Sequence, residues 1–333
     1  MSEQTQLEVR PGFSFKKITP LLGNAFFALA VLLILCLVFR PEFRNPATLC
    51  MIARQVTCVG IIALGMTFVI AGGGIDLSVG SLFALTGVIT VLSLDFLQAH
   101  PEILALTPAN AFFVTLGISL LTGAVGGALN GLLIVLCRIP PFIATLGTLS
   151  VFRSLALHLA HSGSLPMPVS VSRIADPQIG RYQVASLVFL ALTAFFAVLM
   201  SRTAYGRHVC ATGANEKVAR FAGIRTGAVR FMTYVLTGFC TGAAMVLFLG
   251  QLESVPNDAG NLYELDAIAA VVIGGTPMNG GKASLWGTLA GALILGIIFA
   301  LLNFAGTAST LKDLVKGAII LFSVFIQRKE KTI

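Results

Sequence analysis

The stretch "VIAGGGIDLSVGS", Val69 to Ser81, lies between two apolar segments, "VGIIALGMTF" at 59–68 and "LFALTGVITVL" at 82–92. Three consecutive glycines, 72–74, cannot support a stable helix, because glycine loses the most backbone entropy on ordering. Backbone that leaves a helix at membrane depth must be buried in protein or line water. The stretch therefore predicts a helix break inside a membrane-embedded bundle.

Asp76 gives this break two interpretations. Its carboxylate can accept hydrogen bonds from the free N–H groups of a following helix, with Leu77 in the first turn. Alternatively, Asp76 and Ser78 face a polar path, because an acidic residue inside a membrane is by default a candidate functional residue. The sequence alone leaves both interpretations open.

Composition indicates that most of the chain lies in a bilayer. Of the 333 residues, 56% are hydrophobic and 11% are charged, and the mean hydropathy is +0.91. A soluble fold this apolar would lack the polar groups to cover its surface. The net charge of +8 comes from scattered basic residues rather than a dense basic stripe, so nucleic acid is excluded as a partner.

Apolar runs predict an all-α polytopic membrane protein of about ten transmembrane helices, some of them broken or re-entrant, since each span needs about 20 apolar residues. The expected spans are 21–39, 54–71, 77–97, 109–136, 142–160, 183–200, 230–250, 265–275, 285–304 and 311–326. They form one permease-like transmembrane domain, 21–327, with an N-terminal tail, 1–20, and a C-terminal tail, 328–333.

Basic residues predict the orientation of the spans. Ten spans place the N-terminal tail, the charged loop 201–229 and the C-terminal tail on one side, and all three carry Lys or Arg. The positive-inside rule makes this side cytoplasmic, so both termini are expected there. Arg40, Arg44 and Arg54 would then face outward, against the rule, but the other three sites outnumber them.

The opening stretch has a weak internal echo. "VIAGGGIDLSVGSLFALTG" and "VVIGGTPMNGGKASLWGTLAG" each pass from apolar sequence through glycines and a polar turn to small-residue apolar sequence. Broken segments that recur in two halves mark the translocation site in many transporters. Two tight turns between spans would produce the same pattern, and the sequence does not separate these possibilities.

A helix face of small residues is expected within 109–136. Gly123, Gly127 and Gly131 recur every four residues, which places them on one face and predicts close packing against another helix. Asn130 lies beside them and either cross-links helices or touches substrate.

Motifs for chemistry on this chain are missing from its sequence. "GGTPMNGGKAS", 274–284, resembles a phosphate-binding loop but has Thr276 where the first glycine belongs and Ala283 where Ser or Thr would bind magnesium. His158 and His161 share a helix face without a third ligand nearby, so no metal site is expected. No nucleophile motif is present, and we expect no catalytic residue and no cofactor on this chain.

The loop "ATGANEKVARFAGIRTGAVR" contains a short predicted helix. Asn215 suits the N-cap, Glu216 suits the first turn, and Gly223 suits the position just after the helix. Val218, Phe221 and Ala222 fall on one face and form an apolar stripe. A helix this short is unstable alone, so it lies on the membrane surface or docks into a partner protein.

Four blocks of sequence resemble the permease subunits of bacterial ABC sugar importers, the class that takes up ribose, galactose, galactofuranose and autoinducer-2. They are "GMTFVIAGGGIDLSVGS", "IPPFIATLGTL", "RTAYGRHVCATGANEKVARFAGI" and "ELDAIAAVVIGGTPMNGGKASLWGT", in that order over about 50–327. The sequence departs from the family pattern at Ala214, where a second glycine commonly precedes the asparagine, and in "PMNGGKAS".

The resemblance implies a permease that works as a homo- or heterodimer in the inner membrane. It implies a separate cassette ATPase, which holds ATP and magnesium, and a periplasmic binding protein that delivers a monosaccharide. The short helix would then be the coupling helix, with Gly213, Asn215, Val218, Arg220, Phe221 and Gly223 as the coupling residues.

The expected substrate path and a rival function complete the sequence-based hypothesis. Polar groups near the path are expected at Asp76, Ser78, Asn130, Thr145 and Asp266, with Phe142 helping to close it. The rival is a secondary transporter driven by an ion gradient, which would need titratable intramembrane carboxylates. Asp76 and Asp266 are its candidates.

Overall fold

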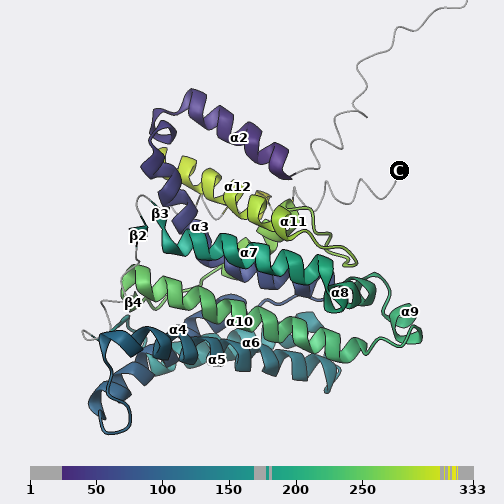
Figure 1. Ribbon diagram of the computed structural model, residues 1–333, viewed down its shortest axis with the longest axis horizontal. Coiled ribbons are helices and arrows are strands. Elements are labelled where there is room, and N and C mark those ends of the chain that lie inside the picture. The colour runs from purple at the N-terminus through teal and green to yellow at the C-terminus, as the bar shows by residue number, and fades with distance from the viewer. Residues whose placement is uncertain are drawn as a thin grey trace, which may run out of the picture.

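The computed structural model describes residues 25–168, 178–179 and 182–307, and residues 311, 314–315, 317–319 and 321 beyond them. Long helices run side by side along one direction (Figure 1). The helical elements are α2 (Ala25–Phe39), the 3₁₀ turn η2 (Pro41–Arg44), α3 (Pro46–Ala71), α4 (Val79–Ala99), α5 (Pro108–Val135), α6 (Pro141–Leu159), α7 (Val184–Arg202), α8 (Ala204–Ala214), α9 (Glu216–Phe221), α10 (Thr226–Leu252), α11 (Tyr263–Ile273) and α12 (Leu285–Phe304).

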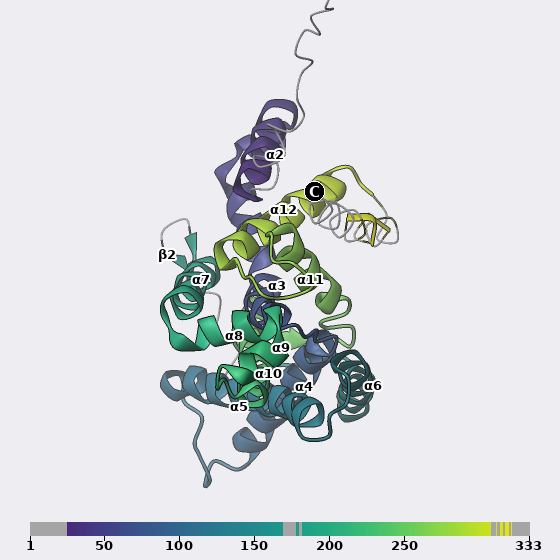
Figure 2. The same cartoon turned by 90° about the vertical axis from the view of Figure 1, so that its right-hand side faces the viewer.

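Helix α3 is the core of the bundle. Its residues from Val56 to Ala71 are almost all buried, and it packs against α7, α10, α11 and α12. Seen end-on, it lies among these helices (Figure 2). A helix that is apolar on every side belongs in the interior of a protein or membrane bundle. Asn45 caps its first turn and Pro46 follows, so α3 begins at 46 rather than at the expected 54.

Seven helices in the described part are long and apolar enough to cross a membrane: α3, α4, α5, α6, α7, α10 and α12. They confirm the spans expected near 54–71, 77–97, 109–136, 142–160, 183–200, 230–250 and 285–304. Helix α2 is a shorter apolar helix in the place of the first expected span. Residues 1–20, 328–333 and much of 311–326 lie outside the described residues, so the total of ten and the side of the termini stay predictions.

Helix α11 corrects the span expected at 265–275. It has 11 residues, so it is about 16 Å long and covers only about half of the hydrocarbon core. Gly274, Gly287 and Gly291 let α11 and α12 pack closely, and the pair forms a hairpin. Helix α4 instead packs mainly against α5, α6 and α10, so the two halves of the sequence echo fold differently.

The two ends of the bundle differ. Strands β1 (Leu165–Pro166) and β4 (Ser254–Val255) pair antiparallel, as do β2 (Gln178–Ile179) and β3 (Tyr182–Gln183). These strands lie at one end, and α8 and α9 lie at the other (Figure 1). The loop expected at 201–229 therefore contains two helices, of which α8 was not anticipated.

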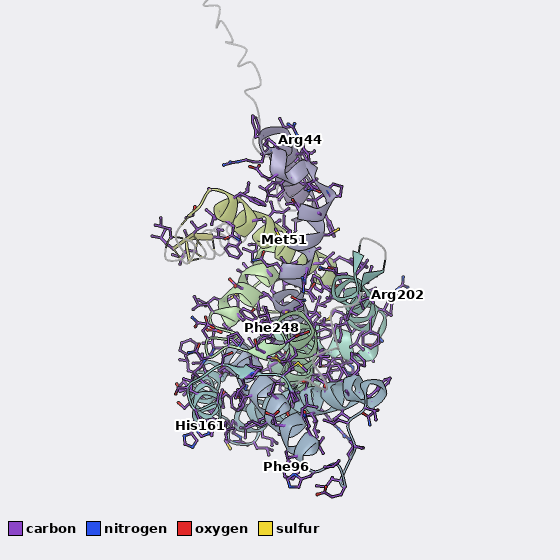
Figure 3. All side chains as sticks on the ribbon, turned by 90° about the vertical axis from the view of Figure 1, so that its left-hand side faces the viewer. Arg44, Met51, Phe96, His161, Arg202 and Phe248 are labelled. Atoms are coloured by element: carbon purple, nitrogen blue, oxygen red, sulfur yellow. The ribbon has the colours of Figure 1, made fainter. Side chains whose placement is uncertain are left out.

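Aromatic contacts fill the middle of the bundle. Phe83 of α4 meets Phe248 of α10 edge to face, with ring centroids 5.1 Å apart, a favourable arrangement for aromatic pairs. Phe248 is half-buried and lies near the centre of the view, whereas Arg44 and Phe96 lie at opposite edges (Figure 3). The described part thus forms one packed helical unit around α3 and α10.

The predicted glycine face joins α5 to α10. A side chain at Gly123 would meet the backbone of Gly238 and Gly242, and one at Gly127 would meet the backbone of Tyr234 and Gly238. Small residues at such a crossing let two backbones approach closely, which is a main source of helix association in membranes. The predicted close packing is confirmed.

Replacing Gly127 by Val should therefore destabilise the bundle by about 1–3 kcal/mol or more, the cost of overpacking. Gly117→Val is the matched control on the same helix, because a Cβ there has nothing within 4 Å. Thermal midpoints of both purified variants in detergent test this. Equal thermal midpoints for the two variants would show that the backbones of α5 and α10 can move apart at this crossing without loss of stability.

Candidate functional site

The glycine string ends α3 and turns the chain. Gly73 takes φ +78°, and the Gly74 N–H donates to the Val69 carbonyl at 2.9 Å, which closes the end of the helix. A Cβ at Gly74 would lie 2.6 Å from the hydroxyl of Tyr234, which donates to the Ile75 carbonyl at 3.1 Å. The predicted helix break is confirmed; Gly72 and Asp76 are buried in protein, whereas Gly73 is exposed.

Asp76 organises the next turn rather than capping a helix at Leu77. Its Oδ1 accepts from the Ser78 N–H at 2.9 Å and from the Ser78 hydroxyl at 2.7 Å. Helix α4 begins at Val79, with Ser78 at its N-cap. The predicted N-cap at Asp76 is therefore wrong by two residues, because the carboxylate bonds its own chain two residues on, as Asp often does in turns.

A buried network of polar side chains surrounds this turn. Asn130 of α5 donates to the Ser78 hydroxyl at 2.7 Å and, at 3.4 Å, to each oxygen of Asp76. Thr148 of α6 donates to the Asn130 carbonyl oxygen at 2.7 Å. Asp76 is 1% exposed and Asn130 is fully buried. Asn130 thus cross-links α5, α6 and the glycine turn, as one of its two interpretations predicts.

The predicted path residues do not all meet. Asp76, Ser78 and Asn130 are in one network, but the buried Thr145 donates to the Pro141 carbonyl of its own helix at 2.8 Å. Phe142 is 55% exposed on the outer face of α6, and Asp266 is buried on α11. Thr148 also belongs to this site and is absent from the predicted set, although its spacing of three from Thr145 puts both on one helix face.

Thr148→Val should lower stability by about 1–2 kcal/mol, because it leaves the buried side-chain oxygen of Asn130, Oδ1, without this donor. Thr145→Val is the control on the same helix, since its lost bond is to a backbone carbonyl only. Thermal midpoints of the two variants in detergent give the comparison. A larger loss of stability for Thr145→Val would contradict the prediction that the bond between Thr148 and Asn130 stabilises the bundle.

Three glycine segments from distant parts of the chain meet at the end of α3. The Gly281 N–H donates to the Ala71 carbonyl at 2.9 Å. Gly213, at the end of α8, lies against the same carbonyl, and Gly280 lies against the backbone of Gly73 and Gly213. We call this contact the glycine junction. It gives the loop 274–284 a structural role, since its Gly281 N–H bonds protein rather than facing outward.

Helix α9 confirms the short helix predicted from local signals. The Asn215 side chain accepts from the Val218 N–H at 3.1 Å, and Gly223 takes φ +83° after the last turn. Ala219 is buried against the bundle. Val218 is 61% exposed and Phe221 is 91% exposed, so the apolar stripe has no cover within the described residues.

Glu216 ties α9 to α10. One oxygen pairs with Arg220 at 3.0 Å, and the other pairs with Arg230 of α10 at 2.9 Å. Partial burial alone would raise the pKa of Glu216, but the charges of Arg230 and Arg220 outweigh it and hold the pKa below its usual value. The carboxylate is therefore ionised throughout the physiological pH range, and both ion pairs persist.

Comparisons with known proteins define the class. A family described as "Branched-chain amino acid transport system / permease component" matches residues 48–324. The chain therefore belongs to this family of ABC transporter permeases. It is a multi-pass protein of the bacterial inner membrane, consistent with its seven helices of spanning length.

Individual relatives refine the class. The ribose import permease protein RbsC of Bacillus subtilis is 36% identical over 99% of both chains. RbsC of Escherichia coli K12 is 35% identical, covering 92% of this chain and 94% of its own. The galactose/methyl galactoside import permease protein MglC of the same strain is 31% identical, covering 91% and 92%. No solved structure matches significantly. The resemblance to sugar-importer permeases is thereby confirmed.

Proposed function

We propose that this chain is the membrane subunit of an ATP-driven importer for a monosaccharide. A periplasmic binding protein delivers the sugar, a second permease copy or paralogue completes the pathway, and a separate cassette ATPase binds ATP and magnesium. The similarity to ribose and galactose permeases supports a pentose or hexose as substrate.

The observation that carries this proposal is the exposed face of α9. A six-residue helix cannot hold itself together, yet Asn215 caps its first turn, and Glu216 and Ala219 anchor it to the bundle from one side. Its other side presents Val218 and Phe221. Large apolar side chains at this exposure gain stability when a partner covers them. The proposed partner is the ATPase, with α9 as the coupling helix.

The rival, an ion-driven transporter, rests on the buried Asp76 and Asp266. Asp76 accepts bonds from Ser78 and Asn130, so a migrating ion would have to displace a satisfied network. We propose instead that Asp76, Ser78, Asn130, Thr145 and Asp266 come to line the path as the helices move, with Phe142 at the face toward the second permease.

Phe221→Asp should abolish retention of the co-expressed cassette ATPase, because it places a charge in the centre of the docking face. Phe221→Leu keeps the face apolar and should retain the ATPase. Affinity purification in detergent, with the ATPase quantified against the permease, measures both. If Phe221→Asp holds the ATPase as well as wild type does, α9 is not the docking element, and uptake should be assayed against sodium and proton gradients.

Motion at α9 has a physical route into the bundle. The Glu216–Arg230 pair joins α9 to α10, and Tyr234 lies one turn beyond Arg230. Tyr234 holds the Ile75 carbonyl, and Asp76 follows in the buried network. Rigid helices and hydrogen-bonded networks carry coupling when they have two arrangements that ligands favour differently.

Glu216→Gln should leave the ATPase bound but lower the sugar transported per ATP hydrolysed by about fivefold or more, the size of a typical coupling energy. The reversal Glu216→Arg with Arg230→Glu restores the pair in the opposite sense and should recover part of the loss. Reconstituted liposomes with loaded binding protein give both rates. Unchanged stoichiometry in Glu216→Gln would remove this pair from the route.

A further inference from the structure

A polar cleft lies beside α9 on the same end of the bundle. It encloses about 590 Å³ between the turn that joins α5 to α6, the first turn of α10, and α9 itself. Its walls include Arg138 and Ile139 from the turn, Glu216 and Arg220 from α9, and Arg230 from α10. The motifs that predict the coupling helix do not account for this cleft.

The cleft has more positive than negative charge. Three arginines line the cleft, Arg138, Arg220 and Arg230, and Glu216 is its one carboxylate. One oxygen of Glu216 pairs with Arg220 and the other pairs with Arg230. The Nε of Arg230 is buried and makes no hydrogen bond within the described residues. The Arg138 side chain is exposed and has no ion pair or hydrogen bond in the same part of the chain. The exposed guanidinium of Arg138 therefore remains available to another acidic group.

The turn holds Arg138 in a defined place. Arg138 takes φ +56°, which is uncommon for a residue other than glycine, and Pro140 and Pro141 fix the chain as it enters α6. The Ile139 N–H donates back to the Leu133 carbonyl at 3.2 Å. The arginine is thus presented by a rigid turn rather than by a mobile loop.

We infer that this cleft receives an acidic side chain of the cassette ATPase, which makes the turn at 136–140 a second docking element beside α9. Arg220 and Glu216 line the cleft from α9, the helix that also carries the exposed Val218 and Phe221, so a protein docked on α9 lies next to the cleft. Guanidinium groups bind carboxylates through paired hydrogen bonds, which suits Asp or Glu as the occupant. The inference rests on the proposed function.

A zero-length carbodiimide cross-link tests it in the assembled complex. Arg138→Lys places a primary amine in the cleft, and carbodiimide joins an amine only to a carboxylate in direct contact. Arg207→Lys is the control, an exposed position on α8 that does not line the cleft. We expect mass spectrometry to find position 138, and not position 207, joined to an Asp or Glu of the ATPase. A link from 138 only to Glu216, or no link, overturns the inference.

Charge reversal gives a second, independent test. Arg138→Glu should release the ATPase at lower salt than wild type does, and Arg207→Glu should not. If Arg138→Glu and wild type release the ATPase at the same salt concentration, but less anionic phospholipid co-purifies with Arg138→Glu, the cleft binds a lipid headgroup. That result would overturn the inference. Failure of wild type to hold any ATPase would instead sink the proposed function. If Phe221→Asp loses the ATPase and Arg138→Glu does not, the second docking element is contradicted while the proposed function stands.

Discussion

The fold depends on which groups form hydrogen bonds with the backbone N–H and C=O groups that lie outside helices in this apolar bundle. Hydrocarbon offers no hydrogen bonds, so each N–H and C=O that leaves a helix at membrane depth must find a partner in protein or in water. At the end of α3 the partners come from far along the chain. The Ala71 carbonyl accepts from Gly281, and the Ile75 carbonyl accepts from Tyr234. Gly213 fits against the same carbonyl of Ala71 because it has no side chain. The glycine junction therefore fixes the relative positions of α3, α8 and the α11–α12 hairpin, and the Tyr234 bond adds α10.

This junction also brings the two candidate functional regions together. Gly213 lies two residues before the N-cap of α9, and the glycine turn at 72–74 leads directly into the network around Asp76. Contacts therefore connect α9 to the network both through α8 and through α10. Since packed interfaces shift between discrete arrangements more readily than they deform, a small movement at α9 can change the state of the bundle.

Features with local causes were predictable, and features with distant causes were not. The α9 helix follows from a cap at Asn215 and a glycine at 223, both within a few residues of the helix they bound. The crossing of α5 and α10 follows from three glycines on one face. Thr148, by contrast, belongs to the network because α6 lies beside Asn130 of α5 in the folded bundle. No pattern within the sequence of α6 predicts that contact. The start of α4 was predicted two residues too early, because the Asp76 carboxylate accepts from the Ser78 N–H in the turn before the helix. Helix α11 lies within two residues of the segment expected at 265–275, but its 11 residues are too few to cross the hydrocarbon core, so the expectation of a span there was wrong.

The same geometry bears on the source of energy. A carboxylate that titrates or carries an ion during transport must trade partners in each cycle. Asp76 instead has acceptor bonds from a backbone N–H, a hydroxyl and an amide, all from residues that also hold helices together. Removing those bonds would separate α5 and α6 from the turn before α4, a large structural cost for one ion. The exposed face of α9 requires no such disruption, because docking there adds burial without breaking any bond within the chain. Force applied from outside the membrane at α9 is therefore the less costly way to change this bundle, which favours a partner ATPase over an ion gradient as its driver.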